Sequence, residues 1–150
     1  MKTAYRTKYN VKKDKCSRTY NGIIFDSELE MKFFRDYILP LHESGEIESY
    51  ELQRSYELQS AYERDGKKVR PIVYKSDFEL TMADGTHLTI DIKGMLKPLE
   101  ILKHKILLHK YPELDFRLIG FSKLDGGWVS IDKITAGRKA RKKLKEKMEE

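Results

Sequence analysis

The sequence predicts a single α/β or α+β domain built around a β-sheet. Its 150 residues fit one domain and leave little room for a second. The hydrophobic residues, 39% of the chain, fall in patterned segments, so the chain can bury a core. The segments follow in the order helix, several strands, helix, strands, which is typical of a sheet covered by helices. This composition excludes collagen-like, disulfide-framework and membrane proteins.

The first helix is expected from about Ser27 to Ser44-Gly45. Residues 1–21 before it are polar and basic with no helical or strand period, which predicts a flexible arm. Asn21-Gly22 is a turn signal, and Pro40 lies near the end of the helix. Spacings of three and four residues give the helix one apolar face. This face consists of Leu29, Phe33, Phe34, Tyr37, Ile38 and Leu41.

A block rich in β-strands is expected next. Residues 47–59 alternate in parts between polar and apolar side chains. Asp65-Gly66 predicts a hairpin turn between strands at 56–63 and 68–74, and residues 72–82 form a further strand candidate. Asp84-Gly85 predicts a second hairpin turn, followed by a strand at 86–93 that stops at Gly94.

The rest of the chain predicts a second helix, two last strands and a helical tail. Pro98 precedes a helix of about residues 99–111, and strands follow at 115–121 and 127–132. The tail from Thr135 carries a narrow apolar stripe of Ala136, Ala140, Leu144 and Met148. We therefore divide the chain into a basic flexible arm (1–21), a folded domain (22–132) and a basic C-terminal helix (133–150).

The net charge of +6 is distributed unevenly along the chain. Residues 1–21 hold seven basic residues and one acidic residue, and residues 133–150 hold eight basic and three acidic residues. The middle of the chain is therefore acidic, with a net charge of −5. Two basic ends around an acidic body indicate a polyanionic partner, although each end alone also fits a solubilising terminus.

Several familiar signals of function are absent from the sequence. It has no glycine-rich phosphate loop, no dinucleotide-binding fingerprint and no HExxH motif, which argues against nucleotide cofactors and zinc chemistry. Cys16 is the only cysteine, as expected for a reducing compartment. The N-terminal residues lack the apolar region of a secretory signal. We therefore expect a soluble cytoplasmic protein with no membrane partner.

What remains is a set of carboxylates that the predicted strands bring together. Because side chains alternate along a strand, Asp91 and Lys93 lie on one face. Counting back across the turn at Asp84-Gly85 pairs position 77 with about position 92, so Asp77 lies near Asp91. Glu30 lies close to the apolar stripe of the first helix and points toward both aspartates if that helix packs on the sheet.

Two or three carboxylates and a lysine at a strand end suit a Mg²⁺-dependent phosphodiesterase. Oxygen ligands hold the cation, which generates the attacking hydroxide and neutralises charge on the phosphate. Each residue also has an ordinary explanation. Asp91 and Lys93 fit a half-exposed strand, Ser27-x-x-Glu30 fits a helix capping box, and Asp77 fits a surface position beside a turn.

Ser76-Asp77, followed after 13 residues by Asp91-Ile92-Lys93, resembles the signature of the PD-(D/E)XK nucleases, with Glu30 upstream. The strings YNGIIFDSELE, ELQ, YKSDF, IDIKG and KYPELDFRLI look like a phage-encoded group of these proteins that is related to Holliday-junction resolvases. The resemblance covers about residues 20–122. It implies a restriction-endonuclease-like αβββαβ core with a mixed central sheet flanked by helices.

The resemblance also implies roles for individual residues. Glu30, Asp77 and Asp91 would ligate Mg²⁺, with Mn²⁺ able to substitute, and the Ile92 carbonyl would be a further ligand. Lys93 would assist the attacking water. One departure is visible, because Ser76 stands where the motif has proline.

Nucleic-acid contacts are expected from further residues. Gln53 resembles a glutamine near the active sites of related nucleases, or is an ordinary edge-strand residue. Lys103 and Lys105 would contact the scissile phosphate, or form a solvated helix face. Basic side chains of the tail would follow a nucleic-acid backbone electrostatically. These are Arg138, Lys139, Arg141, Lys142 and Lys143.

The sequence thus predicts a Mg²⁺-dependent endonuclease that hydrolyses DNA phosphodiester bonds, on branched, Holliday-junction-like recombination or replication intermediates. The alternative is a non-catalytic nucleic-acid-binding or phage assembly protein on the same fold, and a third option is a nuclease acting on RNA. A homodimer is expected only by analogy, because a four-way junction needs two symmetric cuts. In a phage-encoded protein the compartment would be the host cytoplasm.

Overall fold

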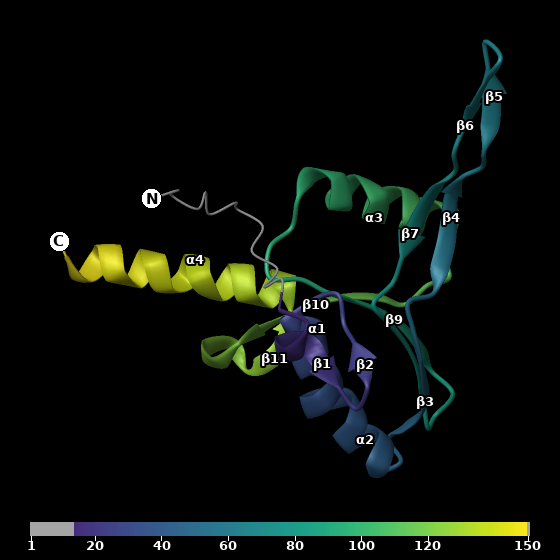
Figure 1. Cartoon of the computed structure of the whole chain (residues 1–150). Helices are drawn as coiled ribbons and strands as arrows, with labels where there is room; N and C mark the ends of the chain where they lie inside the picture. The colour runs from purple at the N-terminus through teal and green to yellow at the C-terminus, as the bar shows by residue number, and fades with distance from the viewer. Residues whose placement is uncertain (1–13, 150) are drawn as a thin grey trace, which may run out of the picture.

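The computed structural model describes residues 14–149, and it has a five-stranded mixed sheet at its centre (Figure 1). The strands β9 and β10 run parallel, and the other neighbouring pairs are antiparallel. The predicted α/β class with a mixed central sheet flanked by helices is therefore confirmed. In spatial order the strands are β11 (Gly127–Ser130), β10 (Phe116–Ser122), β9 (His87–Ile92), β8 (Phe78–Met82) and β3 (Ile47–Leu52).

One face of the sheet is covered by the predicted first helix, which forms three consecutive segments. They are α1 (Glu28–Phe33), a π-helical segment η2 (Phe34–Ile38) and α2 (Leu39–Glu43). The Ser27 hydroxyl accepts a hydrogen bond from the Glu30 amide and caps the first turn. Phe33, Phe34 and Ile38 are buried against sheet residues such as Phe78, and the other apolar positions of the predicted face pack around them.

The predicted strands at 47–59 and 72–82 are each interrupted once. The first becomes β3 and β4 (Ser55–Gln59), and the second becomes β7 (Ile72–Lys75) and β8. β4 pairs with β7 outside the central sheet. Gln53 causes the first interruption, because its φ of 55° is left-handed and does not continue a strand. The interruption at Ser76-Asp77 lies beside it in the neighbouring strand.

Both predicted hairpin turns are present. Asp65 and Gly66 have φ of 51° and 73° between β5 (Tyr62–Arg64) and β6 (Lys67–Val69), as a two-residue turn requires. Gly85 has a φ of 86° between β8 and β9. Figure 1 shows the β5–β6 hairpin extending the β4–β7 pair away from the central sheet.

Helix α3 (Pro98–Lys110) connects the parallel strands β9 and β10 and packs against β4 and β7. Leu107 is fully buried there with Tyr56, Leu58 and Tyr74. The helices α1 and α3 thus lie on opposite faces of β9. Side chains that point to either face of this strand are therefore buried.

The C-terminal helix α4 (Ile131–Met148) begins four residues earlier than predicted, because Ser130 caps it and Ile134 anchors its first turns in the core. Gly120 of β10 permits this close packing, since a Cβ there would lie 2.7 Å from Ile131 Cδ1. The far half of the helix extends beyond the body (Figure 1). Leu144 and Met148 of the predicted stripe are exposed.

At the N-terminal side the described chain departs from the predicted arm. Cys16–Arg18 form a short 3-10 turn, η1, and β1 (Thr19–Tyr20) pairs with β2 (Ile23–Ile24). Tyr20 packs against the main core. The remainder of the predicted arm, residues 1–13, lies outside the described residues. Within residues 14–149, no helix has both the length and the apolar character needed to cross a membrane.

Candidate metal and phosphate site

The candidate site lies where β7 ends and β8 begins. The backbone of Asp77 stays hydrogen-bonded to both neighbouring segments at this interruption. Its amide donates to the Ile90 carbonyl (3.1 Å) and its carbonyl accepts from the Gln53 amide (3.2 Å). Phe78 pairs with Ile90, and continuing this register by one residue places Asp77 opposite Asp91. The sequence count was wrong by one position, but it brings the two aspartates together.

Asp91 is buried, with 2% of its surface exposed, rather than half-exposed. Its Oδ2 accepts a hydrogen bond from the Tyr74 hydroxyl (2.9 Å) and lies 2.9 Å from His104 Nε2. Burial alone would raise the pKa of Asp91, but the hydrogen bond from His104 and the positive charge of Lys93 outweigh it. The pKa of Asp91 is therefore below its usual value, and this carboxylate is ionised.

Asp77 is in the opposite protonation state. Burial, together with the negative charges of Glu30 and Asp91, raises the pKa of Asp77 to about 9. The Asp91 carboxylate beside it favours the protonated form of Asp77, and Asp77 Oδ2 accepts a hydrogen bond from the Ile92 amide (2.7 Å). Two carboxyls that cannot both ionise without a compensating cation are therefore held side by side.

Glu30 is the third carboxyl at this place. It is 7% exposed in the first turn of α1, and burial raises its pKa to about 7, with Asp26 and Asp91 adding to the effect. The Ser27 hydroxyl donates to Glu30 Oε1 (3.1 Å), so the predicted cap is present. The capping explanation and the site explanation are therefore compatible. Glu30 takes part in the cap at the N-terminus of α1, and its carboxyl also interacts electrostatically with the aspartates.

Lys93 supplies the positive charge. Its Nζ lies 3.2 Å from Asp91 Oδ1 and 3.2 Å from Glu100 Oε1 of α3. Burial disfavours the ammonium form, but the Asp91 and Asp77 carboxyls raise the pKa of Lys93 well above its usual value. The lysine stays charged, and it is the cation that partly balances the aspartates.

The oxygen atoms of this site fit a divalent cation. Asp91 Oδ1 is buried and receives no hydrogen bond, although Lys93 is close to it. In a strand the amide and carbonyl of a residue point to the same side, so the Ile92 carbonyl points toward Asp77 as its amide does. Among residues 14–149, no group of three or more His, Cys, Asp and Glu side chains is placed so that it could hold a metal ion, and this includes the predicted set of Glu30, Asp77 and Asp91. Mg²⁺ usually binds one or two carboxylates and keeps several waters, so two aspartates and a carbonyl suffice.

A second polar cluster lies next to Asp91 on the same side of the sheet. Glu79 is 1% exposed and accepts hydrogen bonds from Tyr56 and Thr89 at 2.6 and 2.9 Å, with His87 Nε2 at 2.7 Å. Ser76, which stands where the motif has proline, donates to Glu79 at 2.8 Å. The Ser76 hydroxyl thus provides a hydrogen bond to the buried Glu79 carboxylate beside the site.

Three predicted nucleic-acid contacts differ in their surroundings. Gln53 donates to Asp26 (2.8 Å) just before α1 and so ties the strand interruption to the segment that carries Glu30. Lys103 donates to the Val73 carbonyl (3.1 Å) and so holds α3 on β7. Lys105 is exposed.

The basic residues of α4 also differ in their contacts and exposure. Arg141 is bound to Asp125 by two hydrogen bonds, at 2.7 and 3.0 Å, so it anchors the helix. Lys139, Lys142 and Lys143 are exposed, and Lys142 lies 3.9 Å from Glu146. Arg138 and Lys93 line one groove of about 460 Å³ between α1, the segment after β9 and α4. This groove meets the candidate site at Lys93 and the first turns of the basic helix at Arg138.

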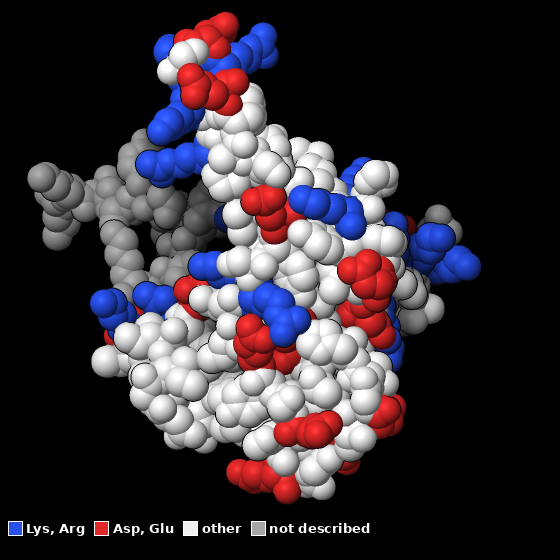
Figure 2. Space-filling view, turned by 90° about the vertical axis from the view of Figure 1, so that its right-hand side faces the viewer, with Lys and Arg blue, Asp and Glu red and all other residues white. Residues whose placement is uncertain are grey.

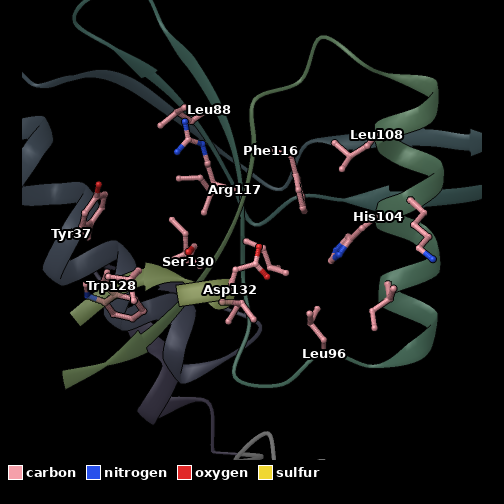
Figure 3. A pocket seen from close by; sticks show the side chains of 17 residues that line it. Tyr37, Leu88, Leu96, His104, Leu108, Phe116, Arg117, Trp128, Ser130 and Asp132 are labelled. Atoms are coloured by element: carbon pink, nitrogen blue, oxygen red, sulfur yellow. The ribbon is translucent and has the colours of Figure 1, made fainter. Parts of the chain in front are cut away.

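A larger groove of about 760 Å³ runs between α3 and strands β10 and β11. Figure 3 shows His104 and Leu108 facing it from α3, with Trp128 and Asp132 across it. It is mainly apolar, and His104 and Lys105 border it, whereas the smaller groove meets the site at Lys93. None of the three carboxylates lines either groove.

The sequence reasoning missed Tyr74, His104 and Glu100, which hold Asp91 and Lys93 in place. His104 has no histidine partner at i, i+4 spacing, so no motif in the sequence singles it out. Its spacing of three residues from Leu107 would have placed it on the buried face of α3. Glu100 lies in the first turn of α3, where its Oε2 accepts a hydrogen bond from the Lys97 amide (3.0 Å).

No curated protein and no solved structure matches this chain. One protein family matches, described as "Protein of unknown function (DUF1064)", and the match covers residues 6–125. The matched range includes the carboxylate site, both hairpins, α3 and most of the central sheet. The chain therefore belongs to the DUF1064 family.

Proposed function

We propose that this protein is a Mg²⁺-dependent endonuclease that hydrolyses DNA phosphodiester bonds in the cytoplasm, with branched DNA as the preferred substrate. The observation that carries the proposal is the pairing of Asp77 with Asp91 at a strand interruption, with the Lys93 ammonium 3.2 Å from Asp91. A buried acidic pair with one adjacent lysine suits hydrolysis of an anion such as phosphate only if a cation binds there.

The residues of the site divide the work among them. A divalent cation held by Asp77, Asp91 and the Ile92 carbonyl would neutralise phosphate charge and lower the pKa of a water. Tyr74 and His104 fix the Asp91 carboxylate, because both contact the same oxygen and leave Oδ1 to face the site. Lys93 orients the attacking water or stabilises the charge that develops on the phosphate. Glu30 adds a carboxyl whose pKa of about 7 lets it take or release a proton near neutrality.

The charge distribution supports a nucleic acid as the partner. The groove beside Lys93 is also lined by Arg138, and the exposed lysines of α4 follow it along the chain. A phosphate backbone passing along this groove would meet the positive charges of Lys93 and Arg138. The affinity would therefore depend on salt through α4 and on the cation at the carboxylates.

The test is cleavage of a labelled four-way junction, a linear duplex and a single strand in Mg²⁺, Mn²⁺ or EDTA. Wild type is compared with Asp91→Asn and Lys93→Met, and Asp132→Asn serves as the control because Asp132 is an exposed aspartate on α4. We expect cutting by wild type and the control in metal, and loss of at least about 100-fold in the two site variants. Absence of metal-dependent cutting of every substrate contradicts the proposal. Equal cutting of junction and duplex leaves a nuclease without junction preference.

One observation favours a second candidate, a non-catalytic nucleic-acid-binding protein. Asp91 Oδ2 is already satisfied by Tyr74 and His104, an arrangement that also suits a purely structural buried carboxylate. Binding of the same DNA molecules without cutting in any metal would select this candidate. Cutting of RNA in preference to DNA would select a ribonuclease.

A further inference from the structure

The β5–β6 hairpin is an arm that contributes little to the core. Every residue from 61 to 68 is exposed, and Val69 is half-buried. A hairpin with three residues in each strand is marginally stable by itself, so this one depends on the β4–β7 pair that it extends. Figure 2 shows basic and acidic side chains crowded at its tip. An exposed, charged ribbon that buries almost nothing is better explained by contact with a partner than by folding.

The two faces of the arm carry different charges. Tyr62 pairs with Val69, Glu63 with Lys68, and Arg64 with Lys67. Because side chains alternate, Tyr62, Arg64, Lys67 and Val69 share one face, whereas the balanced pair of Glu63 and Lys68 lies on the other. The first face, which we call the basic face of the arm, has two positive charges and a ring that is half exposed.

The basic face contains an unfavourable arrangement. Arg64 and Lys67 are like charges directly opposite each other, which destabilises a strand pair. The nearest opposite charge is Asp65, 3.8 Å from Arg64, with both side chains at least 80% exposed, so water screens this pair. A polyanion on this face would turn the repulsion into binding.

The position of the arm indicates which polyanion it would contact. Its ribbon starts at Ser55 and Lys75, directly beside the interruption that carries Asp77. From Asp77 to the turn at Asp65 are twelve residues, so the tip lies at most about 40 Å from the site. One turn of duplex DNA is about 34–36 Å, and a two-stranded ribbon fits the major groove.

We propose that the basic face of the arm binds duplex DNA about one helical turn from the scissile phosphate, with Arg64 and Lys67 on the backbone and Tyr62 in contact with sugar or base. This inference rests on the proposed function for the identity of the partner. It adds a second binding point and a minimum length of duplex next to the cut.

The test measures binding in EDTA, without cutting, by fluorescence anisotropy with duplexes of 30 and 8 base pairs. Arg64→Ala/Lys67→Ala is compared with Lys68→Ala/Arg70→Ala, which removes the same charge from exposed positions of the arm out of phase with the basic face. We expect the first variant to bind the long duplex about tenfold more weakly, with a salt slope smaller by about 2, and the second to change affinity less than about threefold. With the short duplex both variants should match wild type, because it does not span the site and the arm.

Equal weakening by both variants means that only net charge matters and overturns the proposal, as does unchanged binding of the long duplex by Arg64→Ala/Lys67→Ala. Thermal unfolding of each variant shows whether the fold is retained, which is expected for exposed positions. The measurement needs no catalysis. A failure of the nuclease proposal therefore appears as absence of cutting, and a failure of the arm proposal appears as absence of a face-specific effect on binding.

Discussion

Without metal, the Asp77→Asn variant should be more stable than wild type, and this difference in unfolding free energy should grow as the pH rises. The folded protein keeps a proton on Asp77 up to its pKa of about 9, whereas the unfolded chain loses it near 3.8. The stability from this group is therefore complete below pH 3.8 and is lost as the pH rises toward 9. The slope is about 1.4 kcal/mol per pH unit for one proton.

Between pH 6 and pH 8 the wild type should thus lose up to about 2.7 kcal/mol through Asp77. Asp77 remains partly accessible to solvent, so we expect about 1–2 kcal/mol. Asp77→Asn avoids this loss, because a neutral amide has the shape of the protonated carboxyl.

The assay is urea unfolding in EDTA at pH 6, 7 and 8, followed by the fluorescence of Trp128, the only tryptophan. The difference in unfolding free energy between Asp77→Asn and wild type should grow with pH. In millimolar Mg²⁺ the wild type should regain stability, more at pH 8 than at pH 6, because the cation replaces a proton. Parallel pH profiles for the two proteins would refute the assignment of a retained proton to Asp77.

Three further outcomes follow from the packing and from the contacts of Asp91. His104→Phe keeps an aromatic ring but removes the contact with Asp91 Oδ2, so we expect reduced cleavage and a loss of about 1–3 kcal/mol in unfolding free energy, measured by urea titration. Gly120→Ala should cost about 1–3 kcal/mol because its Cβ would meet Ile131 and Ile134, whereas Gly94→Ala, with open space around it, should change stability little; equal thermal shifts would contradict this. Leu107→Ala should cost about 2–5 kcal/mol in the same titration, and Leu108→Ala, which is 41% exposed, should cost much less.

The parts of the fold that depend on local chemistry could be predicted from the sequence. Asp65-Gly66 and Asp84-Gly85 mark turns because few residues adopt their backbone angles, and the register of the second turn brings Asp77 to Asp91 within one residue. The first helix was predicted with its cap at Ser27 and its apolar face.

The remainder depends on contacts between distant segments. Gln53 adopts a left-handed conformation that a non-glycine residue rarely takes, so nothing local marks the interruption there. The strand around Asp91 alternates between polar and apolar residues, as a half-exposed strand does. Asp91 is buried only because α3 packs over its face of the strand. The bond between Lys103 and Val73 likewise depends on how α3 lies on β7.

The strand interruption at Gln53 and Asp77 has a consequence for how this family can vary. The chain leaves the central sheet and returns to it at neighbouring positions, so residues 54–76 form a module whose length is independent of the carboxylates. Removing one cross-strand pair of residues from this module would shorten it by about 3.3 Å, and the side chains at its tip would then point to the opposite face. Removing two pairs would restore the original face. Relatives are therefore expected to differ in steps of four residues here, with the spacing between Asp77 and Asp91 unchanged.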